Sequence, residues 1–170
     1  MVGTPRAGRA CSCAQPRYVS RVYRAYVRRR IRAIFDGLSR SDYTLAVSGL
    51  ADDVHHVFAG DHALGGERRS KDAVRRWFER VFRLYELSFD VERVIVSGPP
   101  WDILVAVEWL GHATPRAGAP YENEGLHVIR IRGGRVVYFH AYEDSQKVAD
   151  ACRVMADAGI EEAAAAPIVD

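Results

Sequence analysis

The pattern of apolar and polar positions divides this chain into a helical first part and a strand-rich second part. Apolar residues recur every three or four positions over residues 19–38 and 71–85, which is the spacing of helices that bury one face. A short helix is predicted between them, starting at Ser41 or Asp42, because both are good N-cap residues. A last helix is predicted over residues 145–158.

The second part alternates apolar and polar residues, which is the period of a β-strand. Strands are predicted over residues 54–58, 87–97, 101–113, 121–132 and 135–142. Gly133 and Gly134 join the last two strands and permit the positive φ of a tight hairpin. Helices followed by a long antiparallel meander predict an α+β fold whose sheet curls around the N-terminal helices. The space left between sheet and helices is a natural pocket.

Length and composition indicate one globular domain. The 170 residues suit a single domain over residues 18–158, between a flexible leader (1–17) and a flexible, low-complexity tail (159–170). A net charge of +2 does not favour nucleic acid as a partner, and no apolar run is long enough to span a membrane. The N-terminus lacks the apolar segment of a secretory signal, so we expect a cytoplasmic location.

The cysteines do not indicate a disulfide framework or a metal site. The chain has three cysteines, an odd number, and Cys11 and Cys13 stand in the leader without further ligands nearby. Cys152 lies on an apolar helix face and is predicted to be a core thiol. We therefore expect no metal and no cofactor.

Polar groups capable of proton transfer share one strand face with apolar neighbours. Alternation places Tyr121, Asn123, Gly125, His127 and Ile129 on the same side of a strand. A concave sheet with such a face makes an apolar pocket that holds a few polar groups. A histidine in that pocket can serve as acid or base at neutral pH.

Several local motifs occur in a recognisable order. They are ADDVHHVF, the glycine pair Gly65-Gly66, KDAVRRWFERVF, SGPPW, and NEGLHVIRIRGGRVV followed by YEDSQ. Together they resemble the nuclear transport factor 2-like superfamily, and more closely its SnoaL-like branch, over about residues 30 to 150. The resemblance implies a cone-shaped α+β barrel, a deep apolar pocket and a homodimer formed through the outer sheet face. Such relatives include polyketide cyclases, ketosteroid isomerases, dehydratases, epoxide hydrolases and non-catalytic binding proteins.

The resemblance also suggests catalytic candidates. His127 matches the pocket histidine of the polyketide cyclase pattern, and His56 is in register with another pocket position; each has an alternative interpretation as a buried structural histidine. Asn123 could orient His127 or hold a ligand carbonyl. The acidic residue of the cyclase pattern falls on Ala141, although Glu143 and Asp144 are close enough for a β-bulge to alter this alignment.

Aromatic side chains are the candidates for contacts with the ligand. They are Phe58, Trp77, Trp109, Tyr121 and Phe139, and they suit a flat apolar molecule. The leading hypothesis is an enzyme with cofactor-independent acid–base chemistry, acting by cyclisation, isomerisation or dehydration on an oxygenated polyketide or steroid-like ring. The alternative is a small-molecule binding or accessory protein without catalysis. A third interpretation is a scaffold whose sheet face binds a protein.

Overall fold

The computed structural model describes residues 17–170, so Cys11, Cys13 and nearly all of the predicted leader lie outside the described residues. The helices are α1 (Arg17–Leu38), α2 (Thr44–Ser48), α3 (Lys71–Leu84), α4 (Ser145–Asp157) and the 3-10 helix η1 (Glu161–Ala164). The strands are β1 (Leu50–Phe58), β2 (Gly66–Arg68), β3 (Tyr85–Ser97), β4 (Asp102–Pro115), β5 (Tyr121–Arg132) and β6 (Arg135–Glu143). The predicted elements are all present, with boundaries that differ by a few residues.

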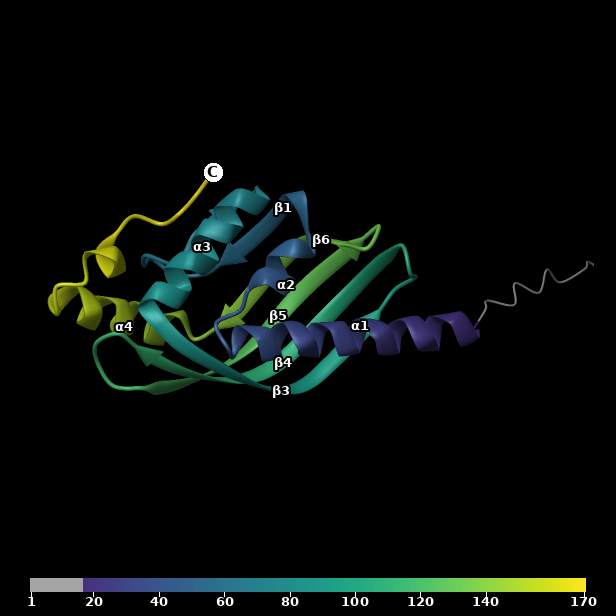
Figure 1. The fold of residues 1–170 in the computed structure, drawn as a ribbon, viewed down its shortest axis with the longest axis horizontal. Coiled ribbons are helices and arrows are strands. Elements are labelled where there is room, and N and C mark those ends of the chain that lie inside the picture. The colour runs from purple at the N-terminus through teal and green to yellow at the C-terminus, as the bar shows by residue number, and fades with distance from the viewer. Residues whose placement is uncertain (1–16) are drawn as a thin grey trace, which may run out of the picture.

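The strands of the described residues form one curved sheet in the order β2-β1-β6-β5-β4-β3. Neighbouring strands pair antiparallel except β1 and β6, which are parallel, so the sheet is mixed at this end. Figure 1 shows α1, α2 and α3 on one side of the sheet, with α4 across the end of its strands. The predicted α+β fold, with a sheet curved around the N-terminal helices, is confirmed.

Local sequence signals explain where several elements begin and turn. Ser70 caps α3, since its hydroxyl accepts a hydrogen bond from the backbone N–H of Ala73. Asp144 caps α4 in the same way, accepting from the backbone N–H groups of Gln146 and Lys147. Gly133 and Gly134 have φ values of 55° and 78°, which allow the tight β5–β6 hairpin. The hairpin sets the register between β5 and β6, so that the inner faces of the two strands lie side by side.

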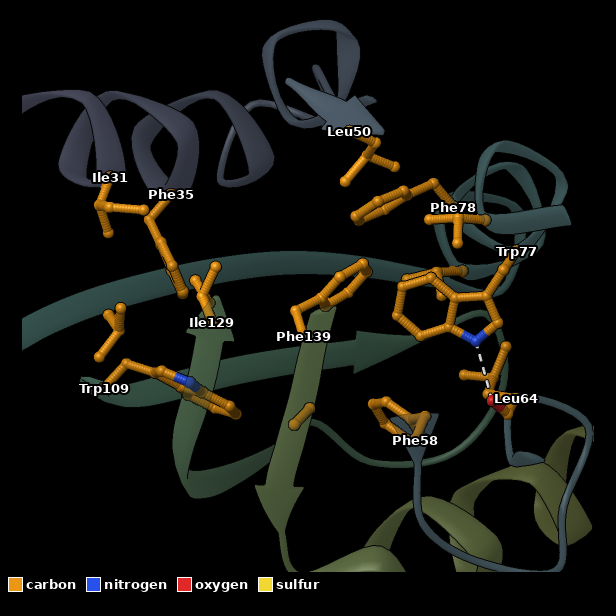
Figure 2. Packing of buried hydrophobic residues seen from close by; sticks show 14 of the residues in the cluster. Ile31, Phe35, Leu50, Phe58, Leu64, Trp77, Phe78, Trp109, Ile129 and Phe139 are labelled. Atoms are coloured by element: carbon orange, nitrogen blue, oxygen red, sulfur yellow. Dashed lines mark hydrogen bonds between the residues drawn. The ribbon is translucent and has the colours of Figure 1, made fainter. Parts of the chain in front are cut away.

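Helix α1 packs on the sheet through its second half. Val27, Ile31 and Phe35 are buried, and Figure 2 shows Ile31 and Phe35 pointing from the helix towards the sheet. The apolar stripe predicted from residue 19 continues beyond this contact, where Val22 and Tyr26 are 60% and 56% exposed. Helical periodicity therefore overstates how much of α1 is buried, because the helix extends past the sheet.

Strand β2 is an element that the sequence analysis does not predict. Its three residues are too few to show alternation, and the strand exists because it pairs with β1, where His56 faces Arg68. The Arg68 side chain is fully buried, which is rare for arginine. Its guanidinium donates hydrogen bonds to the carbonyl oxygens of Leu64 and Gly65 and lies 5.4 Å from the centroid of the Trp77 ring.

The segment expected to be a flexible tail instead makes specific contacts. Residues 161–164 form η1, in which Ala163 is buried. Arg83 of α3 donates to both carboxylate oxygens of Glu162. Ser70, the cap of α3, donates to the side chain of Asp170. An alanine-rich composition therefore does not exclude a packed segment, because small side chains allow close approach to α3.

Candidate functional site

A cavity of about 150 Å³ lies between the helices and the concave face of the sheet. Its walls are almost entirely apolar, with side chains from α1, α3 and the inner face of β3, β4, β5 and β6. Figure 2 shows the centre of this wall, where Trp77 of α3 and Phe139 of β6 approach from opposite sides. The polar residues of the lining are concentrated on β5 and at the end of β6.

Most of the predicted site residues line this cavity. They are Phe58, Trp77, Trp109, Tyr121, Phe139, Asn123 and His127. His56 is the exception and is not part of the lining. The structure therefore brings together seven of the eight predicted side chains around one space.

His127 is held in a single protonation form. The indole N–H of Trp109 donates to its Nδ1 at 2.6 Å, and because an indole can only donate, Nδ1 must be unprotonated. The neutral ring therefore carries its proton on Nε2, for which no hydrogen-bond partner is found among the described residues. Burial, and to a lesser degree His140, lowers the pKa of His127 to about 4. At neutral pH, His127 thus offers the cavity an N–H donor.

Glu143 is the acidic residue of the cavity. It lines the space at the end of β6, two residues after Ala141 and on the same face. Burial, reinforced by the nearby negative charge of Asp144, raises its pKa to about 7. No cationic side chain of the described residues pairs with it. A carboxyl group that is half ionised at neutral pH can give or take a proton, which is the property expected of a general acid or base.

Glu143 was not among the predicted catalytic residues, although the signal was present. The family pattern places its acidic residue at Ala141, which is buried directly opposite His127 in the β5–β6 pairing. Because side chains alternate along a strand, Phe139, Ala141 and Glu143 lie on the same face of β6. The next acidic residue on the face therefore lies one step further along β6, opposite Gly125.

Asn123 links the two strands at the polar end of the cavity. Its side-chain N–H donates to the backbone carbonyl of Asp144 at 3.2 Å, next to Glu143, and its buried Oδ1 has no hydrogen-bond partner within residues 17–170. Tyr121, two residues earlier, has a pKa raised to about 12, chiefly by burial. It therefore remains a neutral hydroxyl at physiological pH. Asn123 thus supports the backbone that carries Glu143 and leaves one acceptor oxygen free.

His56 lies behind the cavity wall. Its ring stacks on Phe139 with centroids 4.0 Å apart, meets Trp77 edge-on at 4.6 Å and is fully buried. Burial, followed by the charge of Arg68, lowers the pKa of His56 well below its usual value. It is therefore a neutral packing residue, and the sequence did not reveal this because the rings that enclose it come from β6 and α3 and meet it only in the folded protein.

Two further classes of site have no counterpart in the described residues. Residues 17–170 contain no group of three His, Cys, Asp or Glu side chains arranged as metal ligands. None of the helices described has both the length and the apolar character needed to cross a membrane. Cys152 is a buried thiol 3.6 Å from the hydroxyl of Tyr85, as expected for a core position.

Comparison with solved structures identifies chains of the same fold. A nuclear transport factor 2-like protein of unknown function from Burkholderia pseudomallei is 23% identical with a TM-score of 0.63, over 72% of this chain and 93% of that one. A proposed polyketide cyclase from Xanthomonas campestris is 17% identical with a TM-score of 0.59, over 74% and 95%. A proposed scytalone dehydratase from Novosphingobium aromaticivorans is 10% identical with a TM-score of 0.62, over 73% and 85%. These likenesses establish the fold.

The family follows from the sequence match. Comparison with curated proteins finds no match. A family model described as the SnoaL-like domain matches residues 31–139, which include α3, most of the sheet and the whole of β5. The chain therefore belongs to the SnoaL-like family and has the nuclear transport factor 2-like fold.

Proposed function

We propose that this protein is an enzyme that moves a proton on an oxygenated apolar ring compound, without a cofactor. The observation that carries this proposal is the pairing of two groups in one apolar cavity: a carboxyl, Glu143, with a pKa of about 7, and a neutral histidine, His127, with a free N–H. The same low-polarity surroundings raise the pKa of Glu143 and lower the pKa of His127. Glu143 can therefore exchange a proton near neutral pH, whereas His127 stays neutral and donates a hydrogen bond.

The arrangement suits removal of a proton next to a carbonyl group. Glu143 and His127 are diagonal neighbours on adjacent strands, which places their Cα atoms roughly 7–8 Å apart. A ketone between them can present its carbonyl oxygen to His127 and its α-hydrogen to Glu143. The ionised Glu143 takes the proton, and the Nε2–H of His127 donates a hydrogen bond to the enolate oxygen that forms.

The fate of the enolate then sets the reaction. Return of the proton from Glu143 at another carbon gives isomerisation. Loss of a β-hydroxyl, which takes the proton from Glu143 and leaves as water, gives dehydration. Attack of the enolate carbon on a second carbonyl of the same molecule gives cyclisation, and the alkoxide oxygen that forms takes the proton from Glu143. Cyclisation and dehydration are also the activities for which two structural neighbours are named, which lends these two outcomes weight for this chain.

The cavity also restricts the size of the substrate. An apolar cavity of about 150 Å³ in another protein takes up benzene, so this one suits one ring or two fused rings as it stands. Larger polyketide or steroid-like rings require side chains of the wall to move. The aromatic residues of the lining favour a flat ligand.

Hydrogen–deuterium exchange of a simple ketone tests this function. β-Tetralone, a bicyclic ketone with acidic α-hydrogens, is incubated with the protein in deuterium oxide, and the loss of its α-hydrogen signal is followed by NMR. We expect the protein to accelerate exchange and Glu143→Gln to reduce the rate about 100-fold or more, the usual contribution of a general base. Glu124→Gln, an exposed carboxyl on the opposite face of β5, is the matched control and should keep the rate.

A non-catalytic binding protein is the second candidate, and the position of Ala141 favours it. The residue directly opposite His127 has no acidic group, where the family pattern has one. In this case β-tetralone shifts the NMR signals of cavity residues on binding, yet its α-hydrogens exchange no faster than in buffer. That result would refute the proposed acid–base activity.

We further propose that the protein forms a homodimer through the outer face of the sheet and works in the cytoplasm. Four large apolar side chains on that face are between 38% and 53% exposed: Ile95, Leu104, Leu126 and Tyr142. Strand pairing arranges them as two pairs: Leu126 lies directly opposite Tyr142, and Ile95 and Leu104 are diagonal neighbours on β3 and β4. Charged residues stand among them, with Arg130 opposite Leu104 and Glu108 opposite Leu126, so the face mixes apolar side chains with arginine, a residue enriched at protein interfaces.

A further inference from the structure

Trp109 occupies a slot formed by two glycines on the inner face of the sheet. It stands opposite Gly125 in the β4–β5 pairing, and Gly111 is the next residue on its own face. A Cβ at Gly125 would overlap the six-membered ring of the indole, and a Cβ at Gly111 would lie 2.7 Å from it. Neither glycine has a positive φ, so turn geometry does not explain them. Their function here is to let a large ring approach the backbone closely.

The slot aims the indole N–H at His127. The Trp109 Nε1 to His127 Nδ1 distance is 2.6 Å, and the two rings are tilted by 42°. Phe89 packs edge-on against the indole at a centroid distance of 5.2 Å. Phe35 packs edge-on against the imidazole at 5.5 Å. Aromatic neighbours on both sides therefore leave the two rings little freedom to turn away from one another.

We propose that Trp109 is a positioning residue, which fixes His127 as the Nε2–H tautomer so that the site selects a ligand with an acceptor oxygen at that point. An unrestrained imidazole distributes its proton over both nitrogens and can present an acceptor to the cavity. With Nδ1 occupied by the indole, the cavity meets a donor only. This inference deepens the proposed function and rests on it for its catalytic meaning, whereas the tautomer itself can be measured without any substrate.

NMR of the protein with ¹⁵N-labelled histidine tests the proposal directly. We expect His127 to show an unprotonated Nδ1 and a protonated Nε2, with no change between about pH 8 and pH 5.5, because burial and His140 both oppose a second proton. Glu143 lines the same cavity, so the titration is repeated in Glu143→Gln to remove its charge. A protonated Nδ1, or protonation of His127 near pH 6.5, in the wild-type protein would overturn the proposal.

Two variants separate the indole hydrogen bond from general loss of packing. In Trp109→Phe we expect a mixture of tautomers and a His127 pKa shifted upwards, because Nδ1 becomes free to accept a proton. Trp77→Phe is the matched control, since it removes another buried indole of this cavity whose N–H donates to the carbonyl of Leu64 at 2.8 Å. It should leave the His127 tautomer unchanged. An unchanged tautomer in Trp109→Phe, or the same change in both variants, contradicts the proposal.

Gly125→Ala tests the slot while it retains the tryptophan. The added methyl group displaces the indole, so we expect the same mixture of tautomers as in Trp109→Phe. An unchanged tautomer in a folded Gly125→Ala protein would refute the role of the slot. If neither variant folds, the wild-type measurement still decides whether His127 is locked. A locked tautomer without β-tetralone exchange would reject the acid–base function and leave this inference standing.

Discussion

Glu143 should make the folded protein less stable as the pH rises, and replacing it with glutamine should remove this cost. Burial raises its pKa from 4.5 to about 7, so the folded state holds a proton that the unfolded chain has already released. Stability from this group is fully present below pH 4.5, decreases between pH 4.5 and about 7, and stays low above that. Each unit of pKa shift corresponds to roughly 1.4 kcal/mol in the free energy of unfolding, so the shift of Glu143 costs about 3 kcal/mol in total.

Glutamine has the shape of a protonated glutamate and carries no charge at any pH. Urea unfolding, followed by tryptophan fluorescence, should therefore show Glu143→Gln to be more stable than wild type by about 3 kcal/mol near pH 8 and by only about 1 kcal/mol near pH 5. The difference between the two proteins removes the contributions of titrating groups outside the cavity, because those groups are the same in both.

Glu124→Gln provides the comparison for this experiment. Its side chain is exposed to water on the other face of β5, so this substitution removes no buried charge. We expect the stability difference from wild type to be small at both pH values. A difference between Glu143→Gln and wild type that does not change from pH 5 to pH 8 would show that Glu143 is not buried as described, and the proposed general base would lose its physical basis.

Three other perturbations probe the site, the interface and the helix cap. The pKa of His127 is lowered to about 4, so its contribution to stability is complete above pH 6.5 and is lost as the pH falls towards 4; His127→Phe should weaken this acid dependence by up to about 3 kcal/mol in urea unfolding. Leu104→Arg, on the outer sheet face, should convert a dimer to a monomer in sedimentation velocity, whereas Val22→Arg on α1 should not; two dimeric variants would reject this interface. Asp144→Ala should lower the stability by about 1 kcal/mol through loss of the α4 cap, and Asp144→Asn should restore most of it.

The pKa values of Glu143 and His127 shift in opposite directions for one physical reason. An apolar cavity penalises charge, so it favours the protonated form of a carboxyl and the neutral form of an imidazole. The proton therefore stays on Nε2 of His127, while Glu143 exchanges its own near neutral pH. The stability cost of Glu143 is the kind of compromise expected at a functional site, where a favourable pKa conflicts with a well-packed core.

Much of the fold could be predicted because its signals are local. Helical spacing located α3 to within a residue, since Val74, Trp77 and Val81 must all face the core. Alternation and the pair Gly133-Gly134 located the β5–β6 hairpin for the same reason: side-chain direction in a strand and the φ angles of a turn depend on neighbouring residues. Asn123 and His127 were placed on one face by alternation alone, and the structure puts both on the cavity wall.

The remaining features depend on contacts between residues far apart in the chain. Strand β2 exists only through its pairing with β1, and the burial of Arg68 depends on carbonyl groups that the folded loop presents to it. The hydrogen bond from Trp109 to His127 joins two strands whose relative register the sequence does not state. The sequence by itself thus determined the elements and the polar face of β5. Tertiary structure decided which groups meet in the cavity and in what protonation state, because burial and partners across strands set both.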